Sequence, residues 1–502
     1  QAQGSPCQHS IVWFQHPRLL PSMIPACMAS RCSSVVGASS AAKRLLCGAT
    51  RGMKIASARP VNDGKHVDIE FVDKTAYRFH TEWMKDSNPS AVGSDYYRKS
   101  ANQLFEIDKY IAKEVQPAED GSKLMVRFAN GSTSPIMDEY VATWLHAFAP
   151  FVGQPLHEGA KPAPISAEGL KGTGSLLDDI HKNRKPWSSD VEIPTYDAEA
   201  LANDYAMQAE FIEKMTCPGL AIVHGLGAPK SLEDKDVGMP MEDLVTKVIG
   251  RFNQHPVRAT RYGVMHTRSG AEKNGADYDH SNPLSMHTDH SVYNGTPGYY
   301  QFMYQAQGSV KSKVCDGLAV HNYMRDNHPA EYEILTTVHL THSSRNNIYG
   351  KDGAYAARAE NSEIFELVHT HPIITLDANG DLEKIVQSET KRGVSALPFD
   401  VYEKFMAAYR LWTSLVEKKE FCREFDWPEG SMVCFNNYRI MHGRASVPPN
   451  TQRTMVFAYN MKNIVDNRYR FLRQTLAEQQ NPLMNDRWTT RVPNQVLKSM
   501  VL

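Results

Sequence analysis

The sequence predicts a mostly β protein with some α-helix, built as a small β-rich domain followed by a larger domain of strands and a few helices. Three observations lead to this fold class. Short runs of alternating apolar and polar residues begin near residue 59 and are bounded by the turn signals "NDG" and "NGS". A stretch dense in Pro, Gly, Lys and Ser follows them. Beyond it come a helical pattern, "AEALANDYAMQAEFIEKM", and an apolar strand, "GLAIVHGL".

These patterns give the expected domain boundaries. We expect a tail at 1–58, the small β-rich domain at 59–150, a linker at 151–195 and the larger domain at 196–502. The strands expected in the small domain are "HVDIEFVD", "TAYRFHTEWM" and "KLMVRFANGSTSPI". In the larger domain, "FDVYEKFMAAYRLWTSLVEK" predicts a long amphipathic helix.

The tail has the composition of a targeting segment. Residues 1–58 contain no Asp or Glu but carry Lys and Arg among Ser, Ala and other small residues. A basic, serine-rich start that lacks acidic residues is typical of organellar transit peptides. We therefore expect a mitochondrial or other organellar location. The alternative is a disordered tail without a targeting signal, on a cytoplasmic protein.

Composition narrows the class of partner. The chain has 502 residues, of which 41% are hydrophobic, which is enough for two or three packed domains. Its formal charge of -1 gives no reason to expect a nucleic acid or an anionic membrane as a partner, and no apolar run approaches the roughly 20 residues needed to span a bilayer. Its eight cysteines form no CxxC motif, which favours a reducing compartment. We expect a small-molecule substrate, with a homodimer as one candidate assembly.

A candidate metal site begins at "SMHTDHSVYNGTPGYYQFM". On a strand, His287 and Asp289 point to the same face and can reach one ion together. The spacing alone is weak evidence, because His66 and His80 are also followed two residues later by a carboxylate. A third ligand is offered by His442, at the end of an apolar strand in "SMVCFNNYRIMHGRAS". Two histidines and one carboxylate leave three positions open on Fe(II), as in non-haem iron oxygenases.

The open positions suit a 2-oxo acid and O2. A 2-oxo acid chelates iron through its carboxylate and ketone, and a second carboxylate at its far end then needs a fixed cation. Arg453, on the strand that follows His442, is the candidate for that cation. Neither His66 nor His80 is accompanied by a later histidine and arginine comparable to His442 and Arg453. Both are therefore expected to be ordinary histidines of the small domain.

These segments resemble a known family. Together with "TRYGVMHTR", "VCDGLAVHNYMRDNHPAEYEIL" and "RTMVFAYNMKNIVDNRYRFL", they are similar to the γ-butyrobetaine hydroxylase and trimethyllysine dioxygenase family of Fe(II)- and 2-oxoglutarate-dependent dioxygenases, over roughly residues 60–475. The resemblance implies a double-stranded β-helix (jelly-roll) catalytic domain. It implies His287, Asp289 and His442 as Fe(II) ligands and Arg453 as the 2-oxoglutarate anchor, with O2 as the second cosubstrate. Arg444 is expected either to orient 2-oxoglutarate or to form a surface salt bridge.

The small domain resembles the accessory domain of the same family through "FHTEWMKDSNP" and "VRFANGSTSPIMDEYVATWL". Family members commonly hold a structural zinc there through clustered cysteines and a histidine. This chain has "SNPSAVGSDYYRKS" where the cysteines would lie, and Ser132 and Thr133 where the histidine would lie. We therefore expect no structural zinc, because a tetrahedral site needs about four such ligands.

The resemblance also implies an aromatic cage for a trimethylammonium group. Matching by position puts Tyr262, Tyr278 and Tyr459 in the cage, and His266 where a tryptophan is usual. Each tyrosine could instead be ordinary core packing. Gln387 or Ser388 stands where an asparagine usually holds the substrate carboxylate.

Several functions follow from this pattern. The expected substrate is of the γ-butyrobetaine or trimethyllysine type, as in carnitine biosynthesis. Alternatives are another small amine, an amino acid or an aminophosphonate, and a non-catalytic binding protein on the same fold. A zinc hydrolase would use a similar metal site but would have no need of Arg453.

Overall fold

The structure is a computed structural model that describes residues 52–89, 110–129, 137–157, 180–181, 184–253, 261–268, 283–293, 298–346, 365–448 and 451–480. Residues 1–51 and Tyr278 lie outside these ranges, so most of the expected tail and one expected cage residue are not described. The last part of the expected tail, 1–58, is described, and a strand begins there at Ile55.

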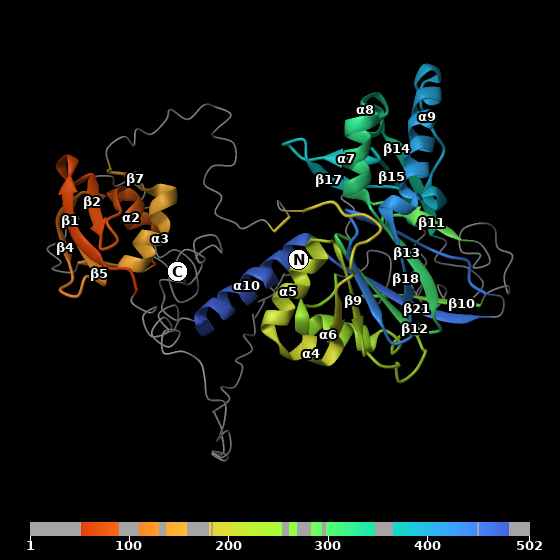
Figure 1. Ribbon diagram of the computed structural model, residues 1–502, viewed down its shortest axis with the longest axis horizontal. Helices are drawn as coiled ribbons and strands as arrows, with labels where there is room; N and C mark the ends of the chain where they lie inside the picture. The colour runs from red at the N-terminus through yellow and green to blue at the C-terminus, as the bar shows by residue number, and fades with distance from the viewer. Residues whose placement is uncertain are drawn as a thin grey trace, which may run out of the picture. The chain divides into compact units, whose positions relative to one another are not determined.

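In its described residues, the N-terminal domain has two small sheets and two α-helices, drawn red to orange in Figure 1. The elements of the first sheet, in spatial order, are β1 (Ile55–Val61), β2 (His66–Phe71), β3 (Ala76–His80) and β7 (Gln154–Pro155). The second sheet has β4 (Ala112–Pro117), β5 (Lys123–Phe128) and β6 (Asp138–Val141), and the helices are α2 (Thr81–Ser87) and α3 (Ala142–Val152). The expected strand "TAYRFHTEWM" therefore ends at His80, and α3 and β7 carry the domain past residue 150.

The larger part of the chain is built around two β-sheets. The six-stranded sheet has the order β10 (Gly263–Arg268), β21 (Gln452–Asn460), β12 (Tyr300–Gln307), β19 (Met432–Asn436), β9 (Leu220–His224), β8 (Thr195–Asp197). The four-stranded sheet has the order β11 (Leu284–His287), β20 (Ile440–Arg444), β13 (Val310–Asp316), β18 (Cys422–Trp427). All of these strands pair antiparallel except β8 with β9. The predicted strand "GLAIVHGL" is β9.

Side chains that alternate along each strand divide the core into layers. In β19, Val433 and Phe435 join a cluster shared with the four-stranded sheet, whereas Met432 and Cys434 join a cluster shared with helices. The six-stranded sheet is covered by α4 (Ala198–Asn203), α5 (Tyr205–Thr216), α6 (Met239–Val248) and α10 (Lys462–Gln480). The four-stranded sheet is covered by α7 (Gly317–Asn327), α8 (Pro329–Thr337) and α9 (Phe399–Val416) (Figure 1). The two sheets therefore enclose an inner layer that the helices do not reach.

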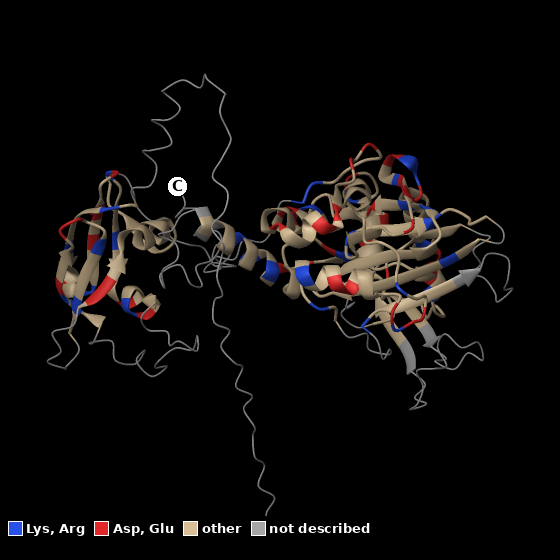
Figure 2. Cartoon of the chain, turned by 90° about the horizontal axis from the view of Figure 1, so that it is seen from below, with Lys and Arg blue, Asp and Glu red and all other residues tan. Residues whose placement is uncertain are grey.

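Shorter elements complete the described fold. Two-stranded sheets are formed by β14 (Leu340–Asn346) with β15 (Phe365–His371), and by β16 (Ile374–Leu376) with β17 (Leu382–Ile385). Single 3-10 turns lie at Asn62–Gly64, Glu389–Lys391 and Lys419–Phe421. Acidic and basic residues are mixed over the described elements (Figure 2). None of the helices in the described ranges combines the length and the apolar character needed to cross a membrane.

A buried ion pair ties the two sheets to the segment before β8. Arg439 donates from Nε to Asp316 Oδ1 and from Nη2 to Asp316 Oδ2, both at 2.8 Å, and neither side chain is exposed. Arg439 also donates to the carbonyl oxygens of Lys185 and Thr216, while the Asp316 carboxylate accepts from the backbone N–H of Trp187. Every charge in this group is thus matched by hydrogen bonds.

We expect Arg439→Met to destabilise the fold by about 3–5 kcal/mol, because it leaves the Asp316 carboxylate buried without its counter-charge. Urea unfolding of the metal-free protein measures this loss. Arg325→Met is the matched control, since Arg325 pairs with Asp326 at the surface and should cost less than about 1 kcal/mol. Equal losses in the two variants would contradict the assignment of Arg439 as a stability determinant.

Candidate functional site

His287 and His442 lie side by side on neighbouring strands. They are partners in the antiparallel pairing of β11 with β20, and their ring centroids are 4.2 Å apart. Asp289 follows β11 and places its two oxygens 3.7 Å from His287 Nε2 and 3.8 Å from His442 Nε2. Within the described ranges this is the only group of three or more His, Cys, Asp or Glu side chains whose ligand atoms all lie within 4.8 Å of one another.

Strand alternation turns both histidines into the layer between the sheets. In β20, Ile440 belongs to the inner core and Met441 to the core under α9, so His442 and Arg444 face inward with Ile440. In β11, Met286 packs into the outer core, which leaves its neighbour His287 on the inner face. The antiparallel register then brings the two rings together.

The protonation states of the group suit a divalent cation. Burial lowers the pKa of His442 to about 3, and His287 acts in the same direction. Burial acts to raise the pKa of Asp289, but the neighbouring imidazoles of His442 and His287 hold it below its ordinary value. His287 Nδ1 lies 2.9 Å from the carbonyl oxygen of Ser285, which makes Nδ1 the donor and leaves a lone pair on Nε2. Two imidazoles and one carboxylate fit Fe(II).

Backbone clamps hold the loop that carries Asp289. The Asp289 N–H donates to Asn437 Oδ1 at 2.9 Å, and Asn437 Nδ2 donates back to the Asp289 carbonyl oxygen at 3.1 Å. The Thr288 N–H donates to the Gln387 carbonyl oxygen at 2.8 Å, and the Gln387 N–H donates to Thr288 Oγ1 at 3.0 Å. Our sequence reasoning missed Asn437. The sequence feature that could have indicated Asn437 is the pair of asparagines just before the strand that carries His442.

Arg453 and Arg444 reach the inner layer from opposite sheets. Arg453 is 5% exposed on β21, where its Nε donates to Gln305 Oε1 at 3.0 Å and its guanidinium lies 5.4 Å from the centre of the Trp427 ring. Burial, together with the positive charge of Arg444, lowers the pKa of Arg453 to about 10. Arg453 therefore stays charged near neutral pH. Arg444 is also buried and does not lie at the surface.

Tyr459 is the expected cage residue that lies beside the ligand loop. It lies on the same face of β21 as Arg453 and Met455, and its ring meets that of His290 edge-on with centroids 4.8 Å apart. His290 directly follows Asp289, and its Nε2 lies 3.3 Å from Gln301 Oε1. Sequence reasoning did not single out His290 or Gln301.

The structure does not bring Tyr262 and His266 to this place. Tyr262 packs in the core under the helices, and its hydroxyl donates to the Lys235 carbonyl oxygen at 2.8 Å. His266 lies on the same face of β10 as Val264, which belongs to that core, and its Nε2 lies 3.0 Å from Asp234 Oδ1. Both side chains therefore point away from the layer that holds His442 and Arg453.

The positions that replace the usual asparagine are both buried. The side-chain oxygen of Gln387 accepts a hydrogen bond from Trp412 Nε1, which turns that side chain toward the core under α9. Ser388 Oγ lies 3.1 Å from Thr390 Oγ1.

The small domain shows no second metal cluster in its described residues. His66 and His80 face each other across β2 and β3 with ring centroids 4.6 Å apart. Ser132, Thr133 and most of "SNPSAVGSDYYRKS" lie outside the described ranges, so the expected lack of a structural zinc stays a prediction.

Comparisons with known proteins show what the chain is similar to. Residues 210–459 match the family described as "Taurine catabolism dioxygenase TauD, TfdA family". "Gamma-butyrobetaine dioxygenase" of Pseudomonas sp. (strain AK-1) is 24% identical over 406 residues, which cover 79% of this chain and 90% of the relative. "Trimethyllysine dioxygenase, mitochondrial" of Rattus norvegicus is 21% identical, covering 76% and 80%. The solved structure of the non-heme iron oxygenase OrfP with Fe, succinate and (3S)-hydroxy-L-Arg superposes with a TM-score of 0.38 at 12% identity, covering 53% of this chain and 94% of that one. The family resemblance read from the sequence is confirmed.

Proposed function

We propose that the chain is an Fe(II)- and 2-oxoglutarate-dependent dioxygenase that hydroxylates an unactivated C–H bond of a small substrate. The match of residues 210–459 to the taurine catabolism dioxygenase TauD, TfdA family supports this. One observation carries the proposal: His287, Asp289 and His442 converge in the same inner layer that receives Arg453. The two facing sheets would be the halves of the double-stranded β-helix expected from the sequence.

The residues of the inner layer have separate tasks in this reaction. Fe(II), held by His287, Asp289 and His442, would supply the activation of O2, coupled to oxidative decarboxylation of 2-oxoglutarate to succinate and CO2. Arg453 would bind the far carboxylate of 2-oxoglutarate through its guanidinium. Apolar side chains such as Phe435 and Met455 keep water out of the layer. No side chain is required as a general base.

For the substrate, we propose a trimethylammonium compound of the γ-butyrobetaine or trimethyllysine type, and hence a step of carnitine biosynthesis. The names of the two relatives support this substrate class. So does the edge-on contact of Tyr459 with His290 next to Asp289, because ring faces can hold a desolvated cation.

Succinate release tests the proposed function. The purified protein with Fe(II), 2-oxoglutarate and O2 should form succinate faster when γ-butyrobetaine or trimethyllysine is added. Stimulation by a different amine, an amino acid or an aminophosphonate would keep the reaction and replace the substrate. A zinc hydrolase or a non-catalytic binding protein would form no succinate under any of these conditions.

Replacing Tyr459 tests the substrate class. We expect Tyr459→Leu to weaken binding of a trimethylammonium substrate by about 0.5–2 kcal/mol, because the cation loses a ring face. A neutral analogue of the same shape, with a tert-butyl group in place of the trimethylammonium group, should lose much less. Competition for substrate-stimulated succinate release measures both affinities. Equal losses would show that Tyr459 only packs, and the trimethylammonium assignment would fail.

We also propose that the acid-free N-terminal segment directs the chain to mitochondria. The composition of residues 1–58 and the word "mitochondrial" in the rat relative's name support this location. Fusion of these residues to a fluorescent protein should carry it to mitochondria, and diffuse fluorescence would contradict the proposal.

A further inference from the structure

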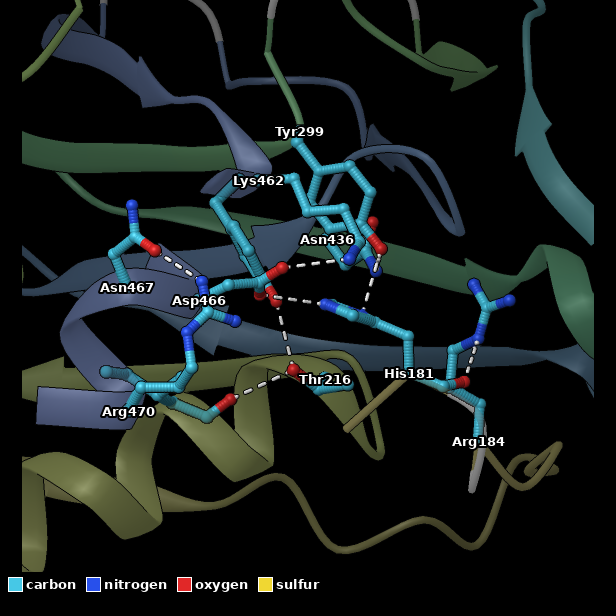
Figure 3. A network of polar contacts seen from close by, with 11 residues as sticks. His181, Arg184, Thr216, Tyr299, Asn436, Lys462, Asp466, Asn467 and Arg470 are labelled. Carbon is cyan, nitrogen blue, oxygen red and sulfur yellow. Dashed lines mark hydrogen bonds and ion pairs between the residues drawn. The ribbon is translucent and has the colours of Figure 1, made fainter. Parts of the chain in front are cut away.

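A buried polar network joins helix α10 to the segment before β8 (Figure 3). His181 is 5% exposed, and its Nε2 lies 3.0 Å from Asp466 Oδ1. The other oxygen of Asp466 accepts from Lys462 Nζ at 2.8 Å. On its far side, His181 Nδ1 lies 3.0 Å from the hydroxyl of Tyr299. His181 thus bridges a carboxylate on α10 and a tyrosine that directly precedes β12.

The partners give these hydrogen bonds one direction. Burial acts to raise the pKa of Asp466, but the hydrogen bonds from His181 and Lys462 hold it below its ordinary value, so the carboxylate accepts. His181 Nε2 then donates to Asp466, and we assign its Nδ1 as the acceptor of the Tyr299 hydroxyl. The Tyr299 oxygen in turn accepts from Asn436 Nδ2 at 3.3 Å. Asn436 Oδ1 is left to accept from the Tyr438 N–H at 3.0 Å.

The network ends at the loop of the metal ligand. The N–H of Asn437, next to Asn436, donates to the Tyr299 carbonyl oxygen at 2.8 Å. The side chain of Asn437 then clamps both backbone groups of Asp289 and donates to the Gly298 carbonyl oxygen at 3.1 Å. Tyr299 therefore contacts both asparagines, one through its hydroxyl and one through its backbone.

We propose that Tyr299, oriented by His181 and Asp466, is a positioning residue that keeps Asp289 aligned for Fe(II) through Asn436 and Asn437. The inference rests on the proposed function, since it requires that His287, Asp289 and His442 bind Fe(II). Outer contacts of this kind fix the geometry of metal ligands, and their loss commonly weakens metal binding. His181 and Asp466 lie outside the 210–459 segment, so the iron site depends on chain segments beyond the matched family region.

Tyr299→Phe tests the proposal by removing one hydroxyl while keeping the ring. Fe(II) affinity is measured anaerobically with saturating 2-oxoglutarate, from the visible charge-transfer band of the Fe(II) chelate. We expect the Kd for Fe(II) to rise roughly tenfold. His181→Phe should have the same effect. His181→Gln should restore most of the affinity, because its amide can donate to Asp466 and accept from Tyr299.

Tyr469→Phe is the matched control. Tyr469 is a buried tyrosine of α10 whose hydroxyl donates to Glu213 Oε1 at 2.5 Å. Thermal unfolding of the metal-free proteins measures the structural loss in each variant. If Tyr299→Phe and Tyr469→Phe lose stability alike and bind Fe(II) alike, the hydroxyl of Tyr299 is only structural and the proposal is overturned.

If Tyr299→Phe does not fold, the comparison of His181→Phe with His181→Gln still tests the proposal. Equal Fe(II) affinity in His181→Phe and His181→Gln would overturn the proposal while leaving the proposed function intact. Failure of the unsubstituted protein to bind Fe(II) would instead overturn the proposed function, and this inference with it.

Discussion

His287→Ala should abolish substrate-stimulated succinate release and lower Fe(II) affinity by more than about 100-fold. The substitution leaves two protein ligands on the metal, and even the loss of an outer contact to a metal ligand costs roughly 10- to 100-fold. The partner strand should stay in place, because the β11–β20 pairing is made by the backbone. Anaerobic Fe(II) titration and succinate assays measure the two effects.

His66→Ala is the matched control for this prediction. His66 belongs to the other His-x-Asp pair of the sequence, but it faces His80 in the N-terminal domain. We expect its removal to leave Fe(II) affinity and succinate release within about twofold, as for substitutions away from a site. Similar losses in His66→Ala and His287→Ala would show that the wrong pair has been assigned to the metal.

Arg453→Met should raise the Kd for 2-oxoglutarate by roughly two to nearly four orders of magnitude. The variant leaves the far carboxylate of 2-oxoglutarate in a desolvated layer without its cation, which costs about 3–5 kcal/mol for a broken buried pair. Fe(II) binding without 2-oxoglutarate should persist, because Arg453 is not among the converging metal ligands. Titration of 2-oxoglutarate into the anaerobic Fe(II) protein separates the two affinities.

Arg444→Met distinguishes the two buried arginines. Arg444 reaches the layer from β20, where its Nη1 donates to the Ala445 carbonyl oxygen at 3.2 Å. If it orients 2-oxoglutarate without anchoring it, its loss should cost less than the loss of Arg453. An unchanged 2-oxoglutarate affinity in Arg453→Met would rule out Arg453 as the anchor, and a larger effect of Arg444→Met would assign that role to Arg444.

The metal ligands could be read from the sequence because their spacing is a local property. The apolar strand leading to His442 places that ligand by strand alternation. The strand expected through His287 and Asp289 ends at His287, however, and Asp289 reaches the site from the turn that follows. The cage could not be read this way. His266 lies on β10 and Tyr262 directly precedes that strand, but which face of β10 looks inward depends on the pairing of His266 with Thr454 on β21.

The sequence also could not predict the long-range polar contacts. Asp316 and Arg439 are 123 residues apart, and Asp466 and His181 are 285 residues apart. Neither pair follows a spacing rule of a helix or a strand, so each is determined only when the sheets and helices have packed. The contact between Asn437 and Asp289 could not be predicted for the same reason, because Asn437 precedes β20 and Asp289 follows β11.

The position of β20 between β11 and β13 has a consequence for when the site forms. Asp289 and its clamp Asn437 are separated by 148 residues, so a growing polypeptide exposes the first two ligands long before the third has left the ribosome. Contacts of such high sequence separation form late in folding, since the loop between them must close first. Iron acquisition should therefore be post-translational, and a nascent chain stalled before Ile440 should show no more than weak, bidentate affinity for the metal.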